Sequence, residues 1–243
     1  MNRRSFVIRG GLIGIALSLL PQFTIAQEQE FDMIELMGKA DIELYGDGYD
    51  LRKEAHDAFV EMYQAALKEG IEIEVVSSYR SFERQAEIFE SKYDRFTEEG
   101  LEPLAAIDKI IEYSTIPGTS RHHWGTEIDI VDKRGGKEGD VLVSEKFESG
   151  GPYSNLKAWM DKNANNYGFY LVYTDEPKRR GFKYEPWHYS YAPLSIPMLT
   201  KFRKKNIMHY LDKEDFEGLK HFTTGFIKTY ITDNILDINP ELL

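Results

Sequence analysis

Cysteine is absent from this 243-residue chain. A protein without cysteine has no disulfides, no thiol nucleophile and no thiolate ligands for a metal. Any metal site must therefore be built from histidine and carboxylate side chains, and the chain has only six histidines. The zinc-protease motif His-Glu-x-x-His is also absent. A metal site in this chain must be of another type.

Long hydrophobic runs are lacking too. The apolar stretch at residues 12–20 is shorter than the roughly 20 residues that cross a bilayer. It follows Arg3, Arg4 and Arg9 and precedes a small-residue cleavage site ending at Ala26, which is typical of a secretory signal peptide. The paired arginines resemble a twin-arginine export signal, although they also suit an ordinary secretory signal. An uncleaved N-terminal anchor is the alternative. We therefore expect residues 1–26 to be a signal peptide.

Basic side chains are scarce after that leader. Cleavage after Ala26 would leave 217 residues, and loss of the three leader arginines leaves 27 basic side chains against 41 acidic ones, a net charge of −14. Such a surface repels nucleic acid and anionic lipid at long range. We expect an exported protein, periplasmic or extracellular, with no nucleic-acid partner and no stable membrane span once the signal is removed.

Helical and strand patterns interleave along the rest of the chain. Apolar periodicity predicts helices over residues 50–70, 81–96, 102–114 and 154–168, and a mostly helical tail from residue 193 onward. Alternation predicts short strands over 71–80, 126–132, 169–174 and 183–192. Because the strands are few and short, the pattern favours an α+β domain with a small antiparallel sheet flanked by helices over a doubly wound fold.

Two short stretches contain the residues that can hold a metal. The stretch "SRHHWGTEID" contains His122 and Asp129, separated by a glycine that permits a tight bend. The stretch "EPWH" adds His188 and Glu185. Two histidines and an aspartate, with a spare carboxylate nearby, are the inventory of a catalytic zinc site with an open position for water. These spacings alone have low specificity, because ordinary turn histidines would give the same pattern.

Three sequence blocks in order resemble the VanY-like D-alanyl-D-alanine carboxypeptidases. "SRHHWGTEID" resembles the family's S-x-H-x-x-G-x-x-x-D motif, "EPWH" its E-x-W-H motif and "SSYRSFERQ" its S-x-Y-R-S-x-x-x-Q block. The resemblance implies a hedgehog/D-Ala-D-Ala peptidase-like fold and a bound Zn2+. The matched blocks imply a zinc peptidase domain at 51–192. The mixed, acidic residues before it predict an N-terminal approach segment at 27–50. Residues 193–243 lie beyond the matched blocks, and we expect them to form a helical C-terminal extension packed on that domain.

The resemblance also implies a role for each matched residue. Zinc would be held by His122, Asp129 and His188, and Glu185 would be the general base that activates water. Arg80 would stabilise the oxyanion or bind the substrate carboxylate. The substrate site would be lined by three more residues, Ser120, Gln85 and Tyr173.

Glu127 departs from the family pattern, which usually has a small residue two positions before the aspartate. On a strand, Glu127 and Asp129 face the same side. Glu127 could therefore orient a ligand histidine or bind the amine of a substrate diamino acid. A bulged strand would instead leave it in solvent.

The expected activity is removal of a terminal D-alanine from peptidoglycan stem peptides by metal-activated water. A D,D-dipeptidase, an L,D-carboxypeptidase and a cross-link endopeptidase are alternatives on the same zinc centre. A catalytically silent wall-binding module is a rival of another class. Retention of both Glu185 and Arg80 disfavours that rival, because binding alone needs no general base.

Overall fold

The computed structural model describes residues 31–243, which form one compact unit. The predicted signal peptide lies outside the described residues. Within the described part, no helix has the length and apolar character needed to cross a bilayer. The α-helices are α1 (Met33–Leu36), α2 (Lys53–Lys68), α3 (Phe82–Glu98), α4 (Pro103–Ile110), α5 (Ser154–Asn163), α6 (Ala192–Phe202), α7 (Met208–Leu211) and α8 (Thr224–Tyr230).

Four strands form one antiparallel sheet in the order β1-β2-β4-β3. They are β1 (Ile73–Ser77), β2 (Glu127–Asp132), β3 (Phe169–Leu171) and β4 (His188–Tyr191). Short 3₁₀ turns are η1 (Arg121–Trp124), η2 (Lys133–Gly135), η3 (Ser144–Lys146), η4 (Ala164–Tyr167), η5 (Leu219–His221) and η7 (Pro240–Leu242), and η6 (Ile231–Ile235) is a π-helical turn. The predicted α+β fold with a small antiparallel sheet is confirmed.

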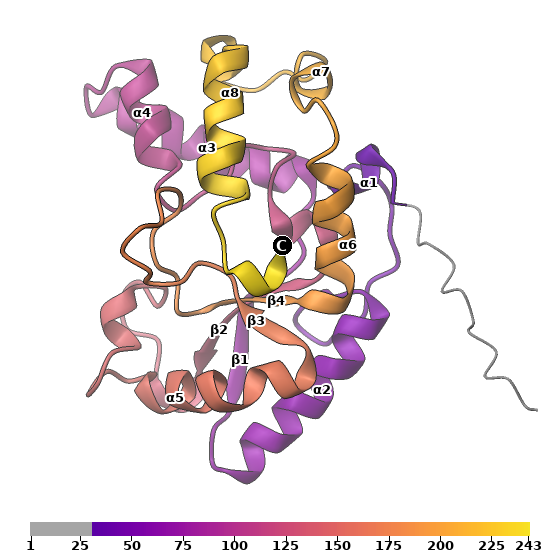
Figure 1. Ribbon diagram of the computed structural model, residues 1–243. Coiled ribbons are helices and arrows are strands. Elements are labelled where there is room, and N and C mark those ends of the chain that lie inside the picture. Colours follow the sequence, from indigo (N-terminus) through magenta and orange to yellow (C-terminus); the bar gives the residue numbers. More distant parts are fainter. Residues whose placement is uncertain (1–30) are drawn as a thin grey trace, which may run out of the picture. The chain divides into compact units, whose positions relative to one another are not determined.

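Helices α2 and α5 cover one face of the sheet, at the bottom of Figure 1. Ala55, Phe59, Met62 and Ala66 recur at helical spacing and are all buried, so α2 presents one apolar face to the sheet. Alternation along β2 directs Ile128 and Ile130 into the same core. The opposite side chains of β2 are therefore free to build a site.

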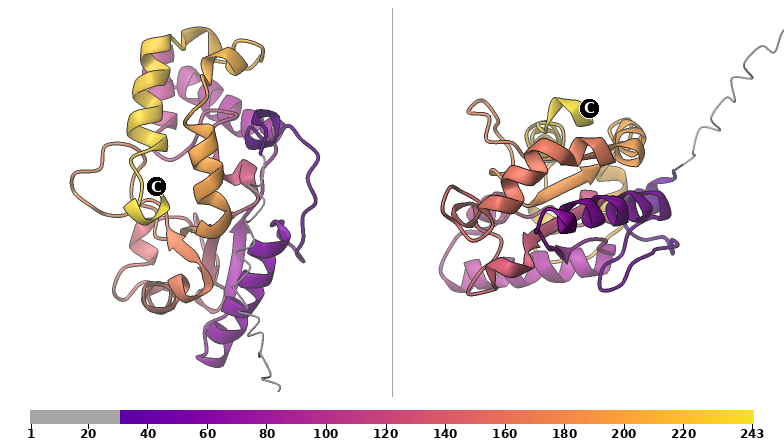
Figure 2. Two further views of the ribbon diagram at one scale, coloured as in Figure 1. Left: turned by 45° about the vertical axis from the view of Figure 1, so that its right-hand side comes forward. Right: turned by 90° about the horizontal axis from the view of Figure 1, so that it is seen from below.

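A second core lies at the other end of the unit, where α3, α4 and α8 are seen at the top of Figure 1 and of the left view of Figure 2. The C-terminal residues take part in it: Ile227, Tyr230, Ile235 and Leu242 are buried with residues of α3 and α4. The tail after residue 193 is thus an integral part of the packed unit.

Several predicted elements are shorter than the sequence pattern suggests. The strand expected at 183–192 begins only at His188, and β3 ends at Leu171 rather than at residue 174. The intervening residues 172–187 form an irregular connection. The helical tail expected from residue 193 onward is interrupted between Phe202 and Met208. The helix expected over 154–168 ends as α5 at Asn163 and is followed by η4.

Candidate metal centre

Two strand residues and one turn residue bring the candidate ligands together. Asp129 on β2 lies directly opposite His188 at the start of β4. His122 belongs to η1, which the left-handed Gly125 (φ 67°) ends. A side chain at this glycine would be strained at that φ and would come within 3.1 Å of Leu44. The sharp turn therefore folds His122 back over the strand that carries Asp129.

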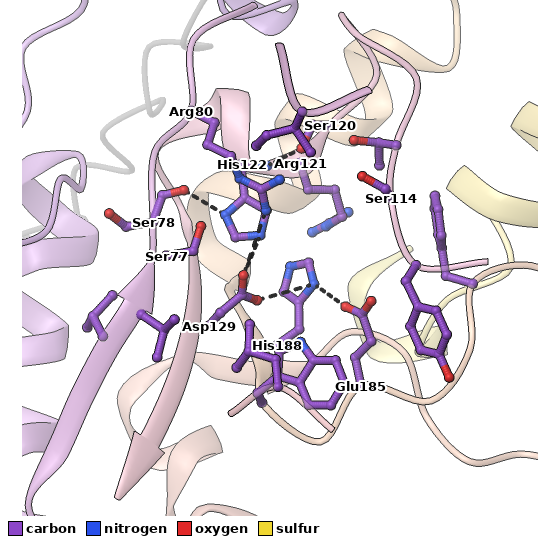
Figure 3. A pocket seen from close by; sticks show the side chains of 18 of the residues that line it. Ser77, Ser78, Arg80, Ser114, Ser120, Arg121, His122, Asp129, Glu185 and His188 are labelled. Atoms are coloured by element: carbon purple, nitrogen blue, oxygen red, sulfur yellow. Dashed lines mark hydrogen bonds and ion pairs between the residues drawn. The ribbon is translucent and has the colours of Figure 1, made fainter. Parts of the chain in front are cut away.

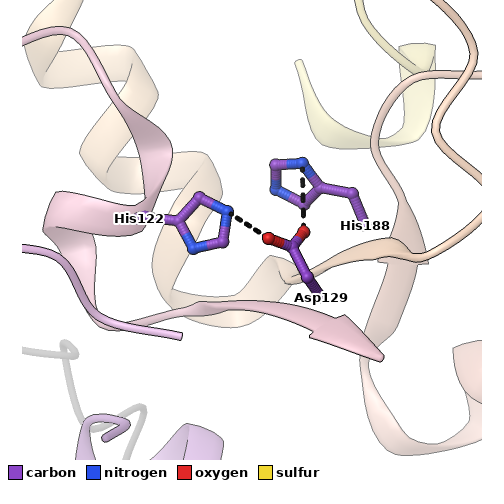
Figure 4. Close-up of side chains that lie close together, drawn as sticks. All are labelled: His122, Asp129 and His188. Carbon is purple, nitrogen blue, oxygen red and sulfur yellow. Dashed lines mark ion pairs between the residues drawn. The ribbon is translucent and has the colours of Figure 1, made fainter. Parts of the chain in front are cut away.

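Both imidazoles point at the Asp129 carboxylate, as Figure 4 shows. His122 Nε2 lies 3.4 Å from Asp129 Oδ2, and His188 Nδ1 lies 3.8 Å from Oδ1. One ligand atom from each of the three residues falls within 4.8 Å of the other two. The three side chains are buried, so they form a compact group of possible metal ligands.

Outer hydrogen bonds determine which nitrogen of each histidine faces the centre. His122 Nδ1 lies 2.6 Å from the carbonyl oxygen of Ser78, which can only accept, so Nδ1 donates and Nε2 has the lone pair. His188 Nε2 lies 3.0 Å from Glu127 Oε2. Despite its burial, the Glu127 carboxylate has a pKa lowered to about 2 by Arg121 and His188, so it accepts from Nε2 and directs Nδ1 inward.

The chemistry of the group fits a divalent ion such as zinc. Two imidazole nitrogens and one carboxylate oxygen are a set that Zn2+ binds, with a fourth position left for water. Asp129 Oδ1 is buried and has no hydrogen-bond partner among the described residues, as expected of an atom that serves a metal. Although burial opposes it, the neighbouring His122 lowers the pKa of Asp129 to about 2, so the ligand is ionised.

Without a metal, His188 lies between two carboxylates. Its Nδ1 is 3.0 Å from Glu185 Oε2 and its Nε2 contacts Glu127. Burial would lower the pKa of His188, but the hydrogen bonds to Glu127 and Glu185 raise it to about 9. Metal binding must therefore displace a proton from this histidine.

Glu185 is a buried carboxyl group on the wall of the cavity. Burial raises its pKa, only partly opposed by its hydrogen bond to His188. Its backbone N–H donates to the Tyr173 carbonyl oxygen at 3.2 Å. This hydrogen bond connects the turn that contains Glu185 to the residues that directly follow β3. A carboxylate with a raised pKa beside the ligand group is suited to taking up a proton and returning it.

Arg80 faces the same space from the turn between β1 and α3 (Figure 3). Its Nη2 lies 3.7 Å from Asp129 Oδ2, and its Nη1 donates to Gln85 Oε1 at 2.8 Å. Gln85 in turn donates to the Thr115 carbonyl oxygen. The Arg80 side chain as a whole is 20% exposed, so its guanidinium group can still donate to a bound oxyanion or carboxylate.

These residues open onto a cavity of about 950 Å³. Ser120, Arg80, Tyr173 and Glu185 line it together with the three candidate ligands. The Tyr173 ring packs edge-on against His188, with ring centroids 5.1 Å apart. The structure therefore brings the predicted ligands, base, arginine, Ser120 and Tyr173 into one concave site.

Gln85 was expected to line the substrate site, and Glu127 either to orient a ligand histidine or to bind the substrate amine, but their positions do not support direct contact with a substrate. Both side chains are fully buried and neither lines the cavity. Gln85 lies behind Arg80, and Glu127 lies behind His188. Each can act on the site only by holding the residue in front of it.

The residues that surround Glu127 were not predicted from the sequence. Arg121 Nε lies 3.3 Å from Glu127 Oε2, and Arg121 Nη2 donates to Ser190 Oγ at 2.7 Å. Ser190 also donates to Glu127 and is hydrogen-bonded to Ser195 at 2.7 Å. An arginine and an acid six positions apart across a turn and a strand are the only signal that the sequence offers for this buried pair.

Comparison with known proteins identifies the family to which the chain is similar. A family model described as VanY, D-alanyl-D-alanine carboxypeptidase, matches residues 48–194. The chain is 33% identical over 167 residues to a Bacillus subtilis (strain 168) protein named as a carboxypeptidase, YodJ, covering 67% of this chain and 54% of that protein. It is 27% identical over 198 residues to a D-alanyl-D-alanine carboxypeptidase of Enterococcus faecalis (strain ATCC 700802 / V583), covering 77% of this chain and 68% of that protein. The chain thus spans about half the length of the first relative.

Solved structures have the same fold. VanYB in complex with D-alanine-D-alanine aligns with a TM-score of 0.51 at 24% identity, covering 73% of this chain and 92% of the other. A mutant of the vancomycin resistance D,D-pentapeptidase VanY in complex with Zn(II) aligns with a TM-score of 0.50 at 23% identity, covering 72% and 90%. At these identities the likeness concerns the fold.

Proposed function

We propose a function from the premise that this chain belongs to the VanY family of D-alanyl-D-alanine carboxypeptidases, whose family model matches more than half of its length. The protein is a zinc-dependent carboxypeptidase that acts outside the cytoplasm and removes a terminal D-alanine from cell-wall stem peptides. The observation that carries this proposal is the convergence of His122, Asp129 and His188 with Glu185 and Arg80 in one cavity.

Zinc held by the three ligands would supply a Lewis acid that lowers the pKa of water to about 7. Glu185 takes the proton of the attacking water and delivers it to the leaving amine, for which its raised pKa suits it. Arg80 donates to the oxygen that becomes negative at the scissile carbonyl, or binds the terminal carboxylate. Tyr173 forms the wall beside them.

Gln85 and Glu127 support this chemistry as positioning residues. The Gln85 amide oxygen accepts one hydrogen bond from Arg80 Nη1 and so fixes the orientation of the guanidinium group. Glu127 accepts a hydrogen bond from His188 Nε2, so that Nδ1, once its own proton is displaced, would offer its lone pair to the metal. The matched family fold supports a peptide substrate, and the VanYB complex names D-alanine-D-alanine as a ligand of that relative.

The test is product analysis with the zinc-loaded protein comprising residues 27–243. Stem peptides ending in D-Ala-D-Ala, in a single D-alanine after an L-centre, and in cross-linked form are incubated with it, and products are identified by mass. Loss of one terminal D-alanine from the first peptide supports the proposal. Release of a dipeptide, cleavage of only the second peptide, or cleavage of the cross-link assigns the site to the alternatives.

A Glu185→Gln variant serves as the control for chemistry. It removes the proton acceptor and leaves the three ligands in place, so zinc content is expected to stay at one equivalent while turnover falls by about 10²- to 10⁴-fold. Peptide binding without cleavage by the unmodified protein would favour a silent wall-binding module instead.

A further inference from the structure

The cavity extends beyond the ligand group along one face of α3. Arg84, Ile88, Lys92 and Arg95 line it, at positions that recur every three or four residues. That spacing places all four side chains on one stripe of the helix. Because the chain as a whole has a net charge of −11, a wall with three cationic positions is a local reversal of its charge.

Lys92 is the unusual member of this stripe. It is half-buried and makes no hydrogen bond or ion pair with any residue of the range 31–243, whereas Arg84 pairs with Glu87 at 2.8 Å. Burial lowers the pKa of Lys92, and the nearby charges of Arg80 and Arg95 lower it further. Glu185 and Asp140 act in the opposite direction but do not offset these effects. Acidic groups thus lie in the same cavity, but none of the described residues forms a direct ion pair with the Lys92 ammonium group.

The position of Lys92 relates it to the reacting end of the cavity. It lines the same cavity as Arg80 and Glu185, and its charge interacts with both of them. Helical side chains lean toward the N-terminus, which brings the Lys92 head group back toward the Arg80 end. An extended peptide advances about 3.3–3.6 Å per residue, so two or three substrate residues cover about 7–11 Å of the cavity wall from the scissile bond toward Lys92.

We propose that Lys92, with Arg95 beside it, forms a subsite for a carboxylate that the substrate carries two or three residues before the scissile bond. The proposal rests on the proposed function, because it names the substrate class of the same cavity. Asp140 and Glu145 line the cavity as well, so a side chain that ends in both an amine and a carboxylate meets charges of both signs.

The experiment uses pairs of stem pentapeptides that end in D-Ala-D-Ala and differ in one carboxylate. In the first pair the third residue is meso-diaminopimelate or lysine, which differ by the side-chain carboxylate. In the second pair the α-carboxyl group of the second residue, D-glutamate, is free or amidated. KM and kcat are measured for the zinc-loaded protein and for Lys92→Met, Lys92→Arg and Lys68→Met.

For one of the two pairs we expect the carboxylate form to have a KM about tenfold lower than its partner in the unmodified protein. Lys92→Met is expected to abolish this ratio while kcat changes by less than about twofold, the pattern of a lost binding contact. Lys92→Arg should retain the preference. Lys68, exposed on α2 and outside the cavity, is the matched control, and Lys68→Met should leave the ratio intact.

The outcomes separate this inference from the proposed function. The peptide pair whose KM ratio depends on Lys92 identifies the carboxylate that is bound. Equal KM values within both pairs, or ratios that survive in Lys92→Met, overturn the subsite. If the unmodified protein cuts no peptide, the proposed function fails, and calorimetric titration of the same peptides then decides on Lys92: a Lys92-dependent difference in affinity supports the subsite, and its absence overturns it.

Discussion

The two sides of the cavity are built in different ways. The ligand side consists of paired strands and the η1 turn, and the Arg80 backbone N–H donates to the His122 carbonyl oxygen at 3.1 Å. The Glu185 side is the irregular connection 172–187, which has few strand or helix hydrogen bonds of its own. Its own Arg179 side chain holds it together: it donates to the carbonyl oxygens of Thr174 and Phe182 within the connection and to that of Asp237 in the C-terminal segment.

This difference indicates which segments of the chain metal binding and turnover each depend on. The ligand side lies wholly within the matched residues 48–194, whereas Asp237 and Asn239 of the C-terminal segment lie beyond them. Asn239 donates from its backbone to the Val172 carbonyl oxygen and from its side chain to that of Leu171, both at 2.9 Å. Metal binding should therefore be sensitive to the ligand side alone, and turnover to both sides.

Removing a ligand should have the largest effect on metal binding. In His122→Ala the site loses one of three protein ligands. Four-ligand zinc sites bind with about 10–16 kcal/mol, and losing a quarter of that free energy corresponds to a fall in zinc affinity of about 100- to 1000-fold. Competition with a chromophoric chelator measures it. Glu185→Gln is the matched variant on the other side and should bind zinc as the unmodified protein does. Equal affinities in His122→Ala and Glu185→Gln would contradict the ligand assignment.

The residues behind His188 should have the next largest effect. Glu127→Ala removes the acceptor that keeps the His188 proton on Nε2, and zinc affinity should fall by about 10- to 100-fold. The single variant also leaves Arg121 buried without its counter-ion, which destabilises the fold by about 3–5 kcal/mol.

The double variant Glu127→Ala/Arg121→Met separates the two effects, because it removes both charges from the buried site. Its thermal stability should recover while its zinc affinity stays low. Glu127→Gln can still accept a hydrogen bond from His188 and should retain most of the affinity. Zinc binding by the double variant that matches the unmodified protein would show that Glu127 has no role in positioning His188.

The sequence could predict the ligand side because its residues lie in short motifs. His122 and Asp129 are seven positions apart, so a turn and a strand suffice to bring them together. The sequence alone could not distinguish residues that line the cavity from residues behind it. It therefore placed Gln85 in the substrate site and left Glu127 open between orienting a ligand histidine and binding the substrate. Lys92 was missed because a lysine on the polar face of a helix gives no signal of what lies opposite.

The Glu185 side was harder to predict because its supports are distant in the sequence. Asn239 and Leu171 are 68 positions apart, and nothing in the composition of the tail indicates that contact. Strand propensity predicted that the strands include residues 172–174 and 183–187. The backbone between them is irregular instead, because Arg179 donates to the Thr174 and Phe182 carbonyl oxygens and Asn239 to that of Val172. In the connection 172–187, which contains Glu185, tertiary contacts therefore outweigh the local preference of the sequence for strand.

Acid should loosen the ligand side of the metal-free protein through His123. This histidine is fully buried, accepts from the Gly118 N–H at 3.1 Å and donates to the Arg80 carbonyl oxygen at 2.6 Å. Burial lowers its pKa to about 3. The unfolded chain takes up a proton near pH 6.5 and the folded chain does not, so the free energy of unfolding falls as pH drops below about 6.5.

The contribution of His123 is about 1.4 kcal/mol per pH unit, or about 2 kcal/mol at pH 5. Denaturant unfolding of the metal-free protein between pH 7 and 5 measures it. His123→Gln should be less stable at pH 7 and should have a shallower pH dependence, because other groups titrate equally in both proteins. Parallel pH profiles for the two proteins would disprove this role.

The C-terminal support of the Glu185 side should have the smallest effect, and it should be confined to turnover. Asn239→Ala removes the side-chain hydrogen bond to the Leu171 carbonyl oxygen, a loss of about 1 kcal/mol in local stability. Tyr173 lies two residues after Leu171, and its carbonyl oxygen accepts from the Glu185 backbone N–H. A looser Leu171 should therefore misplace both side chains, and we expect kcat to fall about three- to tenfold with zinc affinity unchanged. Asn155→Ala, at an exposed position on α5, is the matched control. A fall in zinc affinity equal to the fall in kcat would mean that the two sides of the cavity are not independently supported.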